Sequence, residues 1–147
     1  MAVKFGDQQT ITKLTEQFDR YFDPATSRMK PGLDPNLREP VFFAAGTTPQ
    51  RYPHLVKMLA ATTDAAETIR IIRAICEFPT SKENMRTSLE MSLDSFKIRR
   101  QDASYALSYV SQNINGGLDT AWQVAQHSSF YSQSAPLFLS CPPNLSL

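Results

Sequence analysis

The fold of this chain is decided by residues 96–124, FKIRRQDASYALSYVSQNINGGLDTAWQV. Apolar residues first recur at the spacing of one helix face, at Ala103, Leu107, Val110 and Ile114. The pair Gly116-Gly117 then interrupts the pattern, and a second apolar stripe begins at Leu118 and includes Trp122, which we expect to face inward. A period of 3.6 residues is that of an amphipathic helix, so the stretch predicts two short helices around a glycine turn.

The same helical period extends upstream through most of the chain. Residues suited to cap a helix precede successive apolar stripes, at Asp7 or Thr10, Asp34, Asp64 and Thr80. We expect Gly46 and Pro79 to end helices, and a stripe from Met85 to Phe96 to form one face of another. No strand pattern is found. We therefore predict an all-α fold of about seven helices in antiparallel pairs, arranged as a compact bundle or, as the wide apolar faces favour, a solenoid-like array.

A change in composition divides the chain after residue 127. Residues 128–147, SSFYSQSAPLFLSCPPNLSL, contain no charged residue and show neither a helical nor an alternating period. We expect residues 1–127 to form the helical domain, and residues 128–147 to be a disordered or non-homologous tail. A docking peptide is the alternative interpretation of the tail.

Composition excludes several kinds of partner. The formal net charge is +1, so no overall field favours nucleic acid or an acidic membrane surface. No apolar run approaches the roughly 20 residues that cross a bilayer. Cys76 and Cys141 lie too far apart to indicate a disulfide framework or a metal site. The N-terminus lacks the apolar core of a signal peptide, and we expect a cytoplasmic protein.

The sequence offers few groups for chemistry. His54 and His127 are the two histidines, and neither belongs to an H-E-x-x-H pattern in which two histidines one helical turn apart bind zinc. We therefore predict no catalytic, metal-binding or cofactor-binding residue. Tyr105 and Tyr109 are four residues apart and share a helix face, so they are candidates to line a groove, with packing as the alternative.

Three motifs in order resemble a known family. The first is DPNLREPV at residues 34–41, the second is IRRQD at residues 98–102, and the third is the pair Ala121-Trp122 after the glycine turn. Their order and spacing resemble the C-terminal helical domain of zinc aminopeptidases of the aminopeptidase-N and puromycin-sensitive types, over residues 8–126.

The resemblance implies antiparallel helix pairs like those of HEAT or armadillo repeats. In the whole enzyme such a domain closes over a thermolysin-like catalytic domain and forms the far wall of the peptide-substrate chamber. Zinc and the catalytic glutamate lie in that catalytic domain, and none of their residues maps onto this chain. In that context helix-end or inter-repeat bonds, rather than substrate contacts, are expected for Arg38, Arg99, Gln101 and Asp102.

The resemblance covers only the last part of the family domain. It predicts a fragment that is inactive alone, and whose partners are the catalytic domain, the remaining helical repeats and, in that context, a peptide substrate. Two alternatives are a stand-alone helical-repeat module that binds a protein, and a truncated product without a selected function.

Overall fold

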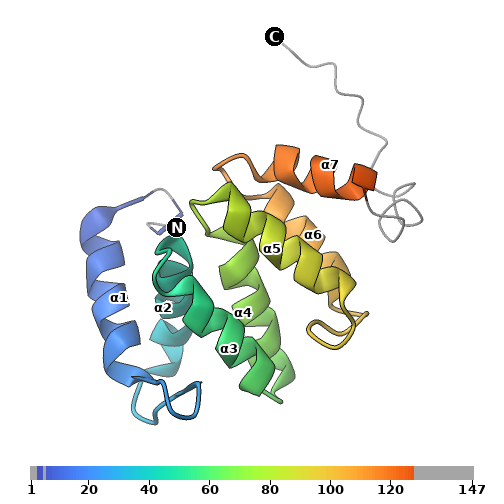
Figure 1. Ribbon diagram of the computed structural model, residues 1–147. Helices are drawn as coiled ribbons and strands as arrows, with labels where there is room; N and C mark the ends of the chain where they lie inside the picture. Colours follow the sequence, from blue (N-terminus) through green and yellow to red (C-terminus); the bar gives the residue numbers. More distant parts are fainter. Residues whose placement is uncertain (1–2, 5, 128–147) are drawn as a thin grey trace.

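The computed structural model describes residues 3–4 and 6–127. In this part of the chain seven helices and one short hairpin follow one another from α1 to α7 (Figure 1). The elements are α1 Gln8–Tyr21, β1 Phe22–Asp23, β2 Arg28–Met29, α2 Pro35–Thr47, α3 Tyr52–Ala61, α4 Ala65–Glu77, α5 Lys82–Leu93, α6 Ala103–Ser111 and α7 Gly117–His127. The prediction of an all-α fold with about seven helices is confirmed.

Short polar side chains start four of these helices. The carboxylates of Asp7, Asp34 and Asp64 accept hydrogen bonds from backbone amides in the first turns of α1, α2 and α4, as the sequence predicted. The prediction of Thr80 as a cap is wrong. Ser81 caps α5, and the Thr80 hydroxyl instead donates to the Thr47 carbonyl at the end of α2.

The helices form two rows. Arg38 near the start of α2 bonds to Glu67 near the start of α4, and the later turns of α2 and α4 also meet, so the two helices run parallel. Asn113 after α6 donates to the Pro79 carbonyl after α4, so α6 runs parallel to both. The row α2, α4, α6 is thus continuous, since α2 packs on α4 and α4 on α6.

The second row is formed by α3, α5 and α7. The hydroxyl of Tyr52, the first residue of α3, lies 2.7 Å from the Ser88 hydroxyl of α5. Gly116 at the start of α7 lies against the side chain of Lys82 at the start of α5. In addition, α3 packs on α4 and α5 packs on α6. The first helix, α1, packs on α2. Such antiparallel pairs, repeated side by side, make the predicted solenoid-like array (Figure 1).

The core runs between the rows and is centred on α4, which contacts α2, α3, α5 and α6. These four neighbours bury α4 on more than one side. The largest fully buried side chains of the core include Phe18, Phe42, Leu55, Ile71, Ile72, Ile75, Met85, Leu89 and Val110.

A small hairpin interrupts the helices after α1. The sequence showed no strand pattern there, but β1 and β2 pair antiparallel, with Phe22 opposite Met29. The Asp23 carboxylate accepts hydrogen bonds from the Ala25 amide and the Thr26 hydroxyl, which fixes the turn between them. Local side-chain bonds of this kind leave no alternating apolar pattern, which is why the hairpin was missed.

Four apolar residues in the C-terminal part of the described chain differ from expectation. Ile114, which was placed on a helix face, is 61% exposed because α6 already ends at Ser111. Leu118 is 67% exposed and Trp122 46% exposed, so the prediction that both face inward is wrong. Phe96, which was placed on the face of a helix, is 99% exposed because α5 already ends at Leu93. Only the side of α7 that bears Gly117, Thr120, Ala121 and Val124 is buried.

Gly46 was expected to end a helix, but α2 continues to Thr47. Its role is close packing: a Cβ atom at this position would collide with the carbonyl oxygen of Ala74 in α4. The glycine therefore sets how near α2 and α4 approach each other.

We predict that Gly46→Ala lowers the free energy of unfolding by about 1–3 kcal/mol, because the two helices must separate or shift. The measurement is urea unfolding followed by far-ultraviolet circular dichroism. A helical glycine without such a neighbour would gain roughly 0.5–1 kcal/mol on the same change. A variant as stable as the parent chain, or more stable, would show that the contact with Ala74 does not limit the approach.

Candidate functional site

Arg73 lies at the centre of the outward surface of the first helix row. Its guanidinium carbon is 4.9 Å from the centre of the Phe43 ring of α2 and 5.7 Å from that of the Tyr109 ring of α6. A cation placed over aromatic faces is attracted by their quadrupoles. The side chain therefore joins three neighbouring helices on one surface, which we call the α2–α4–α6 face.

Two carboxylates and a lysine complete the charge pattern of this face. Arg73 donates from Nε to Glu77 at 2.7 Å, and its Nη1 lies 3.4 Å from the Glu39 carboxylate. Lys4 donates to the other Glu77 oxygen at 2.7 Å. Burial raises the pKa of Glu77, but the hydrogen bonds and charges of Arg73 and Lys4 outweigh this, so its pKa lies below the usual value. Glu77 is thus a nearly buried anion held between two cations.

The candidate tyrosines lie beside this cluster. The rings of Tyr105 and Tyr109 are stacked with their centres 6.2 Å apart, and Tyr105 is 46% exposed. Burial raises the pKa of Tyr109, while the nearby Arg73 charge acts in the opposite direction. The two residues therefore share a face, as their spacing indicated; whether they line a groove stays a prediction.

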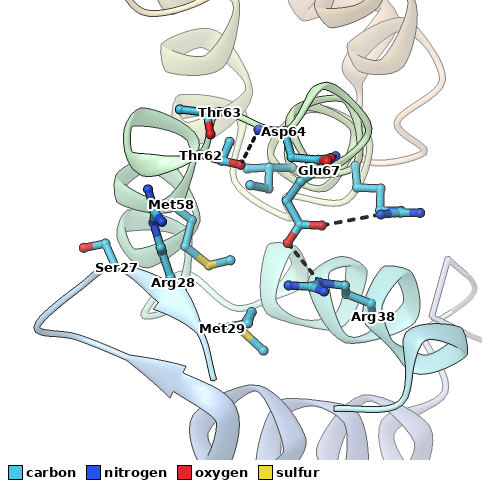
Figure 2. A pocket seen from close by; sticks show the side chains of 11 residues that line it. Ser27, Arg28, Met29, Arg38, Met58, Thr62, Thr63, Asp64 and Glu67 are labelled. Atoms are coloured by element: carbon cyan, nitrogen blue, oxygen red, sulfur yellow. Dashed lines mark hydrogen bonds and ion pairs between the residues drawn. The ribbon is translucent and has the colours of Figure 1, made fainter. Parts of the chain in front are cut away.

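A separate cavity of about 380 Å³ lies at the other end of α4 (Figure 2). It is bounded by the hairpin, the end of α3 and the starts of α2 and α4. Its lining residues are Ser27, Arg28, Met29, Arg38, Met58, Thr62, Thr63, Asp64, Glu67, Arg70 and Ile71.

The charged groups of this cavity bond to one another or to the backbone. Figure 2 shows the Glu67 carboxylate between two arginines: Arg38 donates to it at 3.0 Å, and Arg70 lies 3.5 Å away. Arg28 donates to the Ala61 carbonyl at the end of α3, and Asp64 caps α4. These contacts join α2 to α4 and the hairpin to α3, so Arg38 makes an inter-repeat bond of the kind that the resemblance implied.

The remaining sequence candidates lie apart from one another. His54 packs against the Phe22 ring at 4.7 Å, and His127 is the last residue of α7. Arg99 and Asp102 bond to each other at 2.9 Å in the turn before α6. Over residues 3–4 and 6–127, no three His, Cys, Asp or Glu side chains gather closely enough to hold a metal ion. None of the described helices is long and apolar enough to cross a membrane.

Sequence reasoning found the tyrosines but missed Phe43, Arg73 and Glu77. Arg73 is one of two arginines in the run IRIIRAIC, whose apolar residues indicated only burial. Arg73 and Glu77 are four residues apart on one helix, and this spacing was the available signal. Their contacts with α2 and α6 depend on the packing of the rows.

Two rows of parallel helices, joined by polar bonds between neighbouring pairs, define a helical-repeat domain. Residues 1–128 match the family described as the ERAP1-like C-terminal domain. This chain belongs to that family. The domain is the non-catalytic C-terminal part of an aminopeptidase. The chain matches no curated protein.

We predict that Glu77→Gln lowers the free energy of unfolding by about 1–3 kcal/mol at neutral pH, because Arg73 and Lys4 lose a charged acceptor. The pKa of Glu77 is lower in the folded chain than its ordinary 4.5, so the stabilisation is present above about pH 4.5. It is lost as the pH falls through the lowered folded value. The parent chain and the variant should therefore converge in acid, as measured by denaturant unfolding across the pH range.

Glu90→Gln is the matched control, because Arg86 and Glu90 form an exposed pair with the same spacing. We expect a change within roughly 0.5 kcal/mol for this variant. Equal effects of the two substitutions would mean that the partners of Glu77 add nothing beyond an ordinary surface pair.

Proposed function

We propose that this chain serves as part of the C-terminal helical domain of a zinc aminopeptidase and that its α2–α4–α6 face forms one wall of the peptide-substrate chamber. The family match over residues 1–128 is the observation that carries the proposal. The domain's role is to position and admit peptides, while zinc and the catalytic glutamate belong to a separate catalytic domain. That domain, further helical repeats and the peptide are its partners.

The chemistry of the α2–α4–α6 face supports contact with a peptide. Tyr105 offers a half-exposed ring with a polar tip, which can contact apolar side chains and accept or donate a hydrogen bond. Arg73 and Glu39 present side chains of opposite charge, which are 34% and 46% exposed. Because Arg73 is held by Phe43, Tyr109 and Glu77, this surface is preorganised and would lose little entropy on binding.

The first test compares the purified chain with the native species isolated from cells that contains its peptides. The isolated chain with stoichiometric zinc should not hydrolyse aminoacyl amides, because no described group activates water. The native species should be larger and should hydrolyse them. Activity of the isolated chain would overturn the proposal. A native species of the chain's own size, stable and monomeric, would instead favour a stand-alone helical-repeat binding module.

We predict that Tyr105→Ala in the active species changes the ratio of kcat/KM for long peptides to kcat/KM for an aminoacyl amide by roughly twofold to tenfold. This range corresponds to the loss of an aromatic contact of about 0.5–1.5 kcal/mol. A short substrate does not reach the chamber wall, so the ratio isolates the contact. Glu16 is an exposed residue of α1, at the other end of the array from α6. Glu16→Ala is therefore the control and should leave the ratio unchanged. An unchanged ratio for Tyr105→Ala would contradict the proposal that the α2–α4–α6 face lines the chamber.

A further inference from the structure

The cavity between the hairpin, the end of α3 and the starts of α2 and α4 has an apolar part and a charged part (Figure 2). Met29, Met58 and Ile71 form the apolar part, and Met58 and Ile71 belong to the buried core. The cavity volume of about 380 Å³ falls within the range of roughly 300–1,000 Å³ that is usual for small-molecule sites. The cavity lies between packed elements, and not on the exposed side of the first or last helix.

The charges that line this cavity do not balance. Its lining includes three arginines and two carboxylates, so one positive charge is in excess. Both carboxylates are already engaged. Glu67 lies between Arg38 at 3.0 Å and Arg70 at 3.5 Å, and Asp64 accepts the Glu67 backbone amide at 2.7 Å. The charged part of the cavity therefore favours an anion over a cation.

Arg28 supplies the charge that is not balanced. Its Nη2 donates to the Ala61 carbonyl oxygen at 2.8 Å, and among the described residues no carboxylate forms an ion pair with it. Figure 2 shows Arg28 of β2 and Arg38 of α2 on opposite sides of the cavity. Arg38 uses its Nε for Glu67, so its terminal nitrogens are left for another acceptor. A guanidinium presents its N–H groups in a planar fork that matches the oxygens of a carboxylate or a phosphate.

We propose that this cavity binds a small oxyanion, a carboxylate or a phosphate, that carries an apolar group. The charge of the ligand lies between Arg28 and Arg38, and its apolar group contacts Met29 and Met58. Such a ligand balances the charge of Arg28 while the bond between Arg38 and Glu67 stays in place. Methionine sulfur makes favourable contacts with aromatic rings, so an aromatic acid combines both features.

The test measures the binding of three probes to the purified full chain, by isothermal titration calorimetry and by the shift in Tm. Benzoate, phenyl phosphate and benzylamine share one ring and differ in charge. We expect the two anions to bind and to raise Tm, because they bind the folded chain only, and we expect benzylamine to do neither. The tighter of the two anions identifies the preferred group as a carboxylate or a phosphate. Inorganic phosphate should bind at least about tenfold more weakly than phenyl phosphate, because it lacks the apolar contact.

A substitution of Arg28 tests the charged contact. Arg28→Gln should weaken the binding of both anions by at least about tenfold, because a charge-assisted bond is lost. Arg28 is exposed and its printed bond is to a backbone carbonyl, so we expect the variant to fold, which circular dichroism checks. The matched control is Arg86→Gln, since Arg86 is an exposed arginine of α5 outside the cavity. It should leave both affinities unchanged.

Two further measurements do not depend on that variant. In the parent chain, nuclear magnetic resonance should show that benzoate shifts the amide signals of residues 27–29 and 62–64, and leaves those of α6 unchanged. Met29→Ala should weaken the binding of phenyl phosphate severalfold and leave that of inorganic phosphate unchanged, because only the ring contacts this side chain.

The proposal fails if neither anion binds at millimolar concentration, or if benzylamine binds as tightly as benzoate. It also fails if Arg28→Gln and Arg86→Gln weaken binding equally, or if the shifted amide signals lie away from the cavity, since the anions would then be held by general surface charge. None of these readouts involves peptidase activity. Their outcome is therefore independent of the proposed role in an aminopeptidase.

Discussion

The structure depends on the close approach of α4 to its neighbours in the first row. Gly46 allows α2 to lie against the Ala74 carbonyl, and Asn113 ties the turn after α6 to the Pro79 carbonyl, just beyond the same C-terminal end of α4. With α2 and α6 held in this way, Ile71 and Ile75 are excluded from water on every side. The parallel direction of the row follows, and so does the alignment of side chains from three helices on its outer surface.

That alignment gives the first row an outer surface to which three helices contribute side chains. Arg73 carries a charge in the middle of the row, yet it lies against Phe43 and Tyr109 and shares the Glu77 carboxylate with Lys4. Its position is fixed by groups from α2, α4, α6 and the N-terminal segment at once. A surface built in this way is held in one arrangement before any contact with another molecule.

How well the sequence predicts each feature depends on how far apart in the chain the interacting residues lie. Caps at Asp7, Asp34 and Asp64 are local, since a side chain bonds to an amide two or three residues away. Asp34 and Asp64 were predicted, and Asp7 was one of two candidates for the first helix. The inward orientation of Trp122 was wrong because apolar spacing marks which residues share a face but not whether a neighbour covers it. The role of Gly46 was also missed, because a glycine that permits close packing and one that ends a helix look alike in sequence.

The two-row arrangement also has a consequence for motion. Each helix contacts mainly the helices next to it, so the chain can open in steps from its ends rather than only as a whole. Backbone amides of α4, which has packed neighbours on four sides, exchange with solvent only when most of the array opens. Those of α1 and α7 exchange through smaller, more frequent openings. We therefore expect protection from hydrogen exchange to fall from the centre of the domain toward both outer helices.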